Sequence, residues 1–139
     1  TDERAANLDL VLTAAEEARE ELREYMDRRV PGRWGPIGGD FHQSSVYFNE
    51  VNEPTFFNFD LCGPGWRAYD IAAFLSNANL MHAPAERSEA FFAGYYAVRP
   101  LSEEDHAAIS PFLTIRRVWL MGAFAREDGL VGHTFVGSI

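Results

Sequence analysis

The sequence predicts a mainly α-helical domain of the α+β class that carries one short β-hairpin. Apolar residues recur at three- and four-residue spacing in an early segment, and similar helical patterns return throughout the second half of the chain. Between them lie two short segments with the apolar and alternating character of strands. At 139 residues, the chain is long enough for one hydrophobic core and has the usual length of one domain.

The first helix is predicted over residues 8–29. Its apolar positions, among them Leu8, Leu12 and Leu22, recur at three- and four-residue intervals, while glutamates and arginines occupy the opposite face. Opposite charges three and four residues apart pair in water, so we expect that face to be solvated. Pro31 and Gly32 follow the pattern and end the helix.

A β-hairpin is predicted after this helix. Residues 44–48 and 54–58 are short segments with strand character, and residues 49–53 connect them. Two such short strands form a small hairpin rather than an independent sheet.

The second half of the chain begins with a turn and two helices. Gly63-Pro64-Gly65 predicts the turn, after which a helix is expected over residues 69–79 with Asp70 near its N-cap. Pro84 opens the next helix, over residues 86–96.

Two separate helices are expected after residue 100. Ser102 begins the first, because Asp105 follows three residues later and an acid suits the positive end of a helix dipole. Pro111 suits the first turn of the second, whose apolar residues continue to Phe124. The tail, residues 127–139, is apolar enough to pack against a surface, but its sequence predicts no role.

The charge of the chain excludes one class of partner. There are 21 acidic and 12 basic residues, so the formal net charge is −9, and no basic stripe is present. Nucleic acids and anionic membranes attract basic surfaces, so neither is expected as a partner. Every basic residue is an arginine, which excludes any mechanism that requires a lysine from this chain.

The cysteine content and the hydropathy indicate a cytoplasmic protein. Cys62 is the single cysteine, which rules out an intramolecular disulfide and fits a reducing compartment. No apolar run approaches the roughly 20 residues that a membrane-spanning helix needs, and no signal-peptide pattern opens the chain.

Residues 38–70 contain the pattern that points to chemistry. They read Gly-Gly-Asp-Phe-His-Gln-Ser-Ser at 38–45, Asn-Phe-Asp at 58–60 and Gly-Pro-Gly-Trp-Arg-Ala-Tyr-Asp at 63–70. This resembles the C-terminal lobe of the aminoglycoside phosphotransferase and choline kinase family. There, His-Gly-Asp-x-His-x-x-Asn precedes a hairpin, Asp-Phe-Asp, a glycine-rich turn and a Tyr-Asp pair. The resemblance extends from the first helix to about Arg126.

The resemblance implies a kinase-like C-lobe, with helices around a catalytic loop and a short hairpin. Asp40 falls on the family's catalytic aspartate, with His42 beside it in the loop. Asp70 falls on the aspartate that ties the following helix to that loop. The asparagine and aspartate that hold magnesium on the nucleotide phosphates fall on Ser45 and Asn58.

Three positions depart from the family pattern. Gly38 stands for the histidine two residues before the catalytic aspartate, Ser45 for the metal-binding asparagine and Asn58 for the metal-binding aspartate. Ser45 keeps an oxygen, but Asn58 offers a neutral carbonyl where magnesium depends on charge. Asp60 survives as a substitute ligand, displaced along the strand. We therefore expect metal binding at Ser45 and Asn58 to be weak.

The resemblance also implies that the nucleotide lobe is absent from this chain. Residues 1–7 precede the first predicted helix, and the chain has neither a lysine nor a glycine-rich phosphate loop. We expect residues 1–139 to be a single C-lobe domain, a pseudokinase that is not a competent kinase alone. No cofactor is expected for this chain alone. Magnesium and ATP are expected to bind only if a partner supplies the missing lobe. Because the chain begins at Thr1 without Met, the alternative of a fragment stays open.

Asp40, His42, Asp70 and Cys62 each have a functional and a structural interpretation. Asp40 and His42 could share a proton as an acid–base pair, or His42 could brace the loop. Asp70, as an N-cap, needs no role beyond structure. Cys62 has little nearby positive charge to activate it, so packing is the preferred interpretation.

The candidate substrate-binding residues are two tryptophans, an arginine and an acid. Trp34 and Trp66 flank the loop and could wall a pocket, although aromatic residues are more often core. Arg67 could bind an anionic substrate, but pairing with Asp60 or Asp70 is the preferred interpretation. Asp60 is the remaining candidate ligand contact.

Three functions remain open from the sequence. The first is a repurposed C-lobe that binds a small molecule or performs acid–base chemistry with Asp40, without ATP. The second is half of a split or truncated small-molecule phosphotransferase. The third is a homo-oligomeric interaction module. Fold alone does not choose among them.

A partner is expected on the face that the missing lobe would cover. Apolar surface exposed by the loss of a lobe normally finds a partner. We therefore expect a homodimer, or a complex with another chain.

Overall fold

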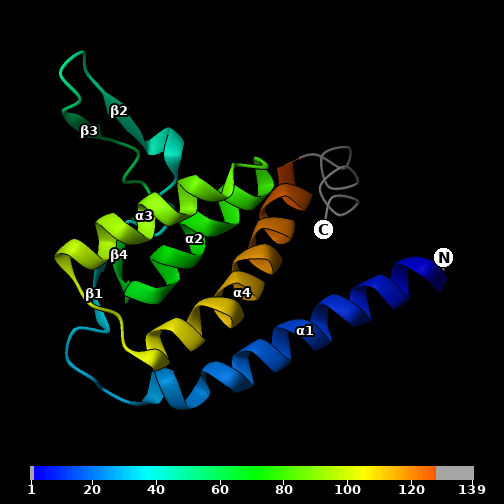
Figure 1. The fold of residues 1–139 in the computed structure, drawn as a ribbon. Coiled ribbons are helices and arrows are strands. Elements are labelled where there is room, and N and C mark those ends of the chain that lie inside the picture. Colours follow the sequence, from blue (N-terminus) through cyan, green and yellow to red (C-terminus); the bar gives the residue numbers. More distant parts are fainter. Residues whose placement is uncertain (1, 128–139) are drawn as a thin grey trace.

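The computed structural model describes residues 2–127, and these residues form a mainly helical fold with two small sheets (Figure 1). The mainly α prediction with a short hairpin is therefore confirmed. The elements are α1 Asp2–Asp27, β1 Trp34–Ile37, the 3₁₀ turn η1 Gln43–Ser45, β2 Val46–Phe48, β3 Pro54–Phe56, β4 Gly63–Trp66, α2 Arg67–Leu80, α3 Ala85–Val98 and α4 Glu103–Glu127.

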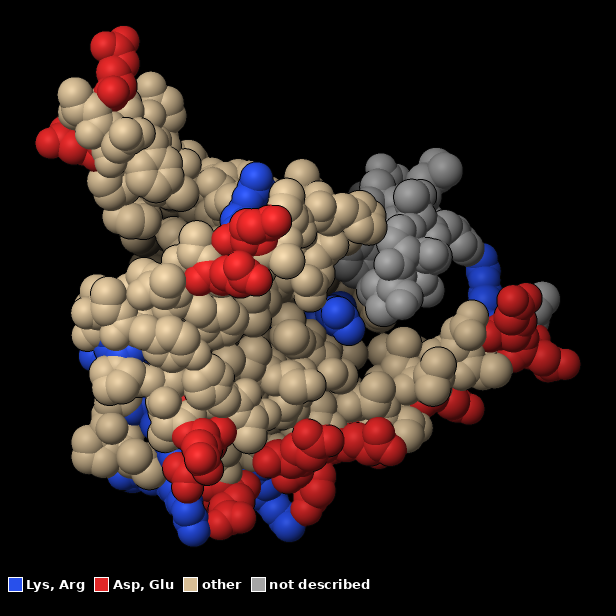
Figure 2. Space-filling view, viewed as in Figure 1, with Lys and Arg blue, Asp and Glu red and all other residues tan. Residues whose placement is uncertain are grey.

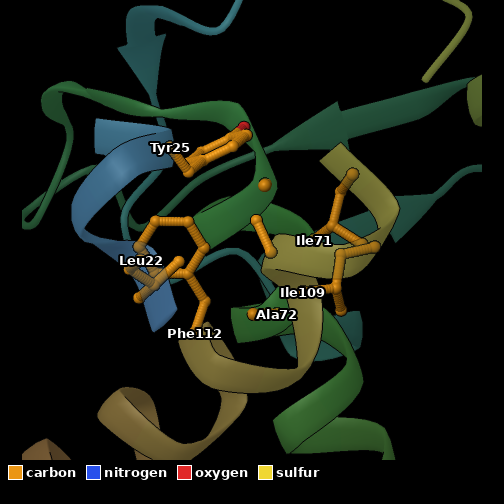
Figure 3. Packing of buried hydrophobic residues seen from close by; sticks show 8 residues of the cluster. Leu22, Tyr25, Ile71, Ala72, Ile109 and Phe112 are labelled. Carbon is orange, nitrogen blue, oxygen red and sulfur yellow. The ribbon is translucent and has the colours of Figure 1, made fainter. Parts of the chain in front are cut away.

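The core lies where α1, α2 and α4 meet (Figure 3). Leu22 and Ile71 are almost completely buried there, and burial of a side chain of this size stabilises the fold by roughly 1.5–3 kcal/mol. Tyr25 and Phe112 meet edge to face with ring centroids 6.0 Å apart. The labelled members of the cluster are Leu22, Tyr25, Ile71, Ala72, Ile109 and Phe112.

Helix α1 is longer than its predicted core-facing pattern. It begins at Asp2 rather than at residue 8, because no helix-breaking residue separates the two. Its buried side chains occur only from Ala18 onward, whereas Leu8 and Leu12 stay exposed. In Figure 1 the two ends of α1 differ accordingly, with the C-terminal end against α4 and the N-terminal end projecting away from it.

The β1–β4 sheet differs from the sequence prediction. Residues 63–65 form part of strand β4 rather than a turn, and β4 pairs antiparallel with β1, which the sequence did not reveal. Trp34 lies opposite Trp66, and Pro36 lies opposite Pro64. A proline cannot donate a ladder hydrogen bond, but it is tolerated at the edge of a two-stranded sheet.

The predicted hairpin is present but shorter than expected. Strand β2 begins at Val46, because residues 43–45 form the 3₁₀ turn, and β3 ends at Phe56. Val46 pairs with Phe56 and Phe48 with Pro54.

Two helix predictions were wrong in detail. Asp70 is not the N-cap of its helix, because α2 begins at Arg67 after Trp66. The two helices expected on either side of Pro111 are one continuous helix, α4. Proline removes one backbone donor there, but the turn around it packs Phe112 into the core, and packing outweighs the local cost.

Within residues 2–127, no helix is both long and apolar enough to cross a bilayer. The apolar tail named in the sequence lies, from residue 128 onward, outside the described residues.

Candidate functional site

The loop after β1 is fixed by Asp70 at the start of α2. Its two carboxylate oxygens accept hydrogen bonds from the backbone N–H groups of Gly38 and Gly39, each 2.8 Å long. A carboxylate that accepts two backbone donors holds them in a fixed geometry. Asp70 thus positions the loop that carries Asp40, and this contact matches the one that the family resemblance implies.

Gly39 is a glycine for a steric reason. Its φ is 73°, in the left-handed region that side chains disfavour, and a Cβ there would collide with the carbonyl oxygen of Leu61. The loop and the segment before β4 therefore approach each other closely, and a glycine permits the contact.

Asp40 forms an ion pair with Arg116 of α4, through its Oδ1 atom. The Arg116 side chain is 6% exposed, and its guanidinium also lies 3.4 Å from the Gly39 carbonyl and from the Tyr69 hydroxyl. It stacks on Trp119 with its carbon 4.7 Å from the ring centroid. One carboxylate oxygen of Asp40 is therefore already neutralised by a buried cation.

Sequence reasoning missed Arg116 altogether. The only local signal was an arginine within an apolar helical stretch, and such an arginine is usually a surface residue. Its partner is 76 residues away in the sequence, so no helical spacing reveals the pair.

The Nε2 atom of His42 faces Oδ2 of Asp40, the carboxylate oxygen that does not pair with Arg116. The imidazole Nδ1 accepts a hydrogen bond from the backbone N–H of Ser44, so a neutral ring carries its proton on Nε2. That Nε2 lies 3.8 Å from Asp40 Oδ2. The side chains are 20% and 25% exposed, so a donor and an acceptor lie side by side within reach of solvent.

The predicted metal positions do not fit magnesium. The Ser45 hydroxyl is buried without a hydrogen-bond partner, while Asn58 is exposed with a φ of 65°. Phe57 donates its N–H to the Ser45 carbonyl over 3.1 Å, which brings the two positions onto neighbouring backbone. They provide one hydroxyl and one neutral amide, whereas magnesium is usually held by carboxylates.

No cluster of charged metal ligands surrounds these two positions in the described part of the chain. Asp40 is paired with Arg116, and Asp60 is exposed. In the described part of the chain, no group of three or more His, Cys, Asp or Glu residues could hold a metal ion.

The two tryptophans predicted to bind substrate are not brought together with Asp40. In the β1–β4 register Trp34 lies opposite Trp66 at one end and Ile37 opposite Gly63 at the other, and Asp40 lies beyond Ile37. Three residues of strand separate the two ends by about 10 Å. The tryptophan rings meet edge to face, 4.4 Å apart, and line a groove of about 560 Å³ with residues 28–33.

Arg67 does not pair as expected. Among residues 2–127 it forms no ion pair, so the expected pairing with Asp60 or Asp70 is wrong. Cys62 is a free, exposed cysteine rather than a packed one.

Comparison with known families decides the broad assignment. Residues 1–112 match the family described as the phosphotransferase enzyme family. The chain belongs to this family. The match includes the loop with Asp40, the hairpin, and helices α2 and α3.

Relatives of this family member are longer proteins. An uncharacterized protein of Deinococcus radiodurans is 35% identical over 127 residues, which are 88% of this chain and 37% of that protein. An uncharacterized protein of Synechocystis is 31% identical over 86 residues, which are 62% of this chain and 24% of that protein. The chain thus spans well under half the length of these relatives.

Two solved kinases share the fold. The microcompartment-associated aminopropanol kinase has a TM-score of 0.75 and 26% identity, over 96% of this chain and 43% of that one. An amicoumacin kinase solved with AMP-PNP, Ca²⁺ and amicoumacin has a TM-score of 0.68 and 21% identity, over 90% and 43%. The fold of this phosphotransferase family member is that of a kinase-like C-lobe.

Proposed function

We propose that this phosphotransferase family member binds a small hydroxyl-bearing molecule at Asp40 and His42 and is not an ATP-dependent kinase by itself. One observation carries the proposal. Asp40 Oδ2 and His42 Nε2 lie 3.8 Å apart, while the other oxygen of Asp40 is held by Arg116. A hydroxyl group both donates and accepts, so it can bridge this acceptor and donor.

The same pair supports acid–base chemistry without a nucleotide. A bound hydroxyl that donates to Asp40 and accepts from His42 has an acid and a base within one hydrogen bond of its oxygen. Arg116 fixes the orientation of the Asp40 carboxylate, and Ser44 fixes the orientation of the imidazole. The chain therefore supplies a positioned proton acceptor that does not require a metal ion.

Phosphoryl transfer by this chain is disfavoured by charge. Catalysis of that reaction depends on cations that neutralise the phosphate oxygens. Ser45 and Asn58 supply neutral ligands at the metal positions, and the chain contains no lysine. A split phosphotransferase, with the missing groups on another chain, would still need an intact metal site in this lobe.

The ligand is tested with an amino alcohol, because the aminopropanol kinase shares this fold. We expect 1-amino-2-propanol to bind in calorimetry and to shift the imidazole resonances of His42. The variant His42→Phe should lose the binding, whereas His82→Phe, at an exposed histidine on another loop, should keep it. If amino alcohols bind equally to both variants, or if a range of small alcohols leaves the His42 resonances unmoved, the proposal is wrong.

The absence of kinase chemistry is tested with ATP and magnesium. We expect no magnesium-dependent heat of ATP binding to the native chain, and at most a weak one for Asn58→Asp, which restores a carboxylate but not the missing lysine. The matched control is Asn52→Asp, because Asn52 is also exposed and has a φ of 61°. Magnesium-dependent binding to the native chain would refute this part of the proposal and favour a split phosphotransferase.

A second candidate function, self-association, is favoured by the β2–β3 hairpin. Tyr47, Phe48 and Phe56 are at least half exposed, and a two-stranded sheet leaves an unpaired edge on each strand. Two copies can pair these edges around a two-fold axis while they cover the aromatic side chains. Figure 1 shows the hairpin projecting from the helices, where a second copy can reach it.

Light scattering tests this second candidate. We expect the mass to rise to that of a dimer as the concentration increases through the micromolar range, and Phe48→Ser to shift the transition to higher concentration. Leu10→Ser on α1 is a control of similar exposure. A monomeric mass at every concentration would exclude the homodimer.

A further inference from the structure

A groove lined by arginines lies at the end of the β1–β4 sheet that is remote from Asp40. It has a volume of about 630 Å³ and lies between residues 30–33, the first turn of α2 and the connection from α3 to α4. This volume is within the roughly 300–1,000 Å³ of sites for small organic ligands. The lining residues that matter here are Arg33, Arg67, Tyr95, Val98, Arg99 and Leu101.

The acidic residues of the groove are already satisfied. Arg33 is buried and pairs with Glu104, and its Nε lies 3.4 Å from Asp105. Asp105 also accepts hydrogen bonds from the hydroxyl of Tyr25, at 2.8 Å, and from the backbone and hydroxyl of Ser102. Burial opposes the charge on Asp105, but these hydrogen bonds and Arg33 hold its pKa below the usual value of 3.8. Arg28, whose guanidinium lies 3.8 Å from Glu104, is the second cation, so Arg33 and Arg28 together balance the charge of the two acids.

Arg67 and Arg99 are left with their charge uncompensated. Neither forms an ion pair with a carboxylate in the described part of the chain, and the Nε of Arg67 is buried without a partner. Arg99 donates a 3.0 Å hydrogen bond to the Gly32 carbonyl. The Arg67 guanidinium lies over Gly35, where a Cβ would collide with it. Gly35 thus leaves room for the Arg67 side chain.

Tyr95 adds a neutral donor to the lining of the groove. Burial is the main cause that raises the pKa of its hydroxyl, although Arg99 and Arg67 act in the opposite direction. The hydroxyl therefore stays protonated at neutral pH. Tyr95, Arg67 and Arg99 all line the groove.

The charge around the groove contrasts with the rest of the molecule. The net charge of the chain is −9, and Figure 2 shows acidic side chains along α1 and at the hairpin tip. In the same view several arginine side chains, interspersed with acidic ones, appear at the end where α1, β1 and the start of α4 meet. Arg67 and Arg99, which pair with no described carboxylate, supply the positive charge that attracts an anion to the groove.

We propose that this groove binds the phosphate group of a small organic phosphomonoester through Arg67 and Arg99. Guanidinium groups form paired hydrogen bonds with phosphate oxygens, and a phosphomonoester carries close to two negative charges at neutral pH, which two arginines balance. The apolar side chains of Val98 and Leu101 line the same groove and cover the organic part. This site is separate from Asp40 and His42, so it does not depend on the function proposed there.

Calorimetry with phenyl phosphate tests the site. We expect phenyl phosphate to bind more tightly than inorganic phosphate, because the phenyl ring covers the apolar lining, and more tightly than benzoate, which carries one charge. Arg67→Gln and Arg99→Gln should each weaken binding roughly tenfold or more, as loss of a charged hydrogen bond does. Gly35→Ala should weaken it as well, since the new methyl group displaces the Arg67 guanidinium without removing its charge.

The control is Arg23→Gln, which removes an exposed arginine of α1 that pairs with Glu20 over 2.6 Å. It should leave the affinity unchanged, and circular dichroism should confirm that each variant is folded. If Arg67→Gln is unfolded, Arg99→Gln decides, because the Arg99 side chain is only partly buried and makes a solvent-exposed hydrogen bond. The proposal is overturned if phenyl phosphate does not bind at millimolar concentration. It is equally overturned if benzoate binds as tightly, or if the arginine variants bind like the native chain.

Discussion

Asp105 joins α4 to two other parts of the chain through one carboxylate. The hydrogen bonds from Ser102 and Tyr25, together with Arg33, lower its pKa in the folded state even though burial opposes this. In acid, the unfolded chain therefore binds more protons than the folded chain. The stabilisation by Asp105 is complete at a pH above the usual pKa of 3.8, and it is lost as the pH falls below that value toward the lower pKa of the folded state. We expect Asp105→Asn to lower the free energy of unfolding by about 1–3 kcal/mol at neutral pH.

Urea denaturation at neutral and acid pH measures this difference. It should shrink in acid, where the native carboxylate is itself protonated. The control is Asp60→Asn. Asp60 is exposed and makes no ion pair among the described residues, so this substitution should change the stability little at either pH. A pH-independent effect of Asp105→Asn would contradict the assignment of its stabilisation to the charged carboxylate.

At the scale of elements, two glycines should respond in opposite directions to alanine. Gly39 lies in the loop before Asp40 with a φ of 73° and no room for a Cβ, so Gly39→Ala should destabilise the protein by about 2 kcal/mol or more. Gly94 lies within α3 with open space around it, so Gly94→Ala should stabilise the helix by about 0.5–1 kcal/mol. Thermal unfolding of both variants checks the signs, and an equal effect would contradict the steric argument.

The elements also show what sequence patterns can and cannot reveal. Helix α2 and the β2–β3 hairpin were predicted within a few residues, because local periodicity determines them. Strands β1 and β4 were not, since each is four residues long and its pairing is set by a partner about 30 residues away. The continuity of α4 through Pro111 depends on core packing, which no local rule contains.

At the scale of the whole molecule, the candidate site is held together by a contact that the motif does not include. The motif located Asp40, His42, Ser45 and Asn58, but not Arg116, which contacts Asp40 from a position 76 residues later in the sequence. The carboxylate at the centre of the site is thus also a tie between the β1 loop and α4. Its contribution to stability and its contribution to binding need to be separated by experiment.

A double-mutant cycle on Asp40 and Arg116 makes this separation. Asp40→Ala removes the carboxylate that pairs with the Arg116 guanidinium, whose side chain is 6% exposed. This should lower the free energy of unfolding by about 2–3 kcal/mol. The loss is smaller than for a fully buried pair, because the Asp40 side chain is 25% exposed. In the double variant Asp40→Ala, Arg116→Met the charge is gone, so the loss should be smaller than the sum of the two single losses by at least about 1 kcal/mol. Additive losses in urea denaturation would mean that the ion pair does not hold α4 to the loop. Suppose that the losses are coupled and that the double variant is at least as stable as Asp40→Ala. The double variant is then folded, so its failure to bind an amino alcohol reports the loss of Asp40 as a ligand contact.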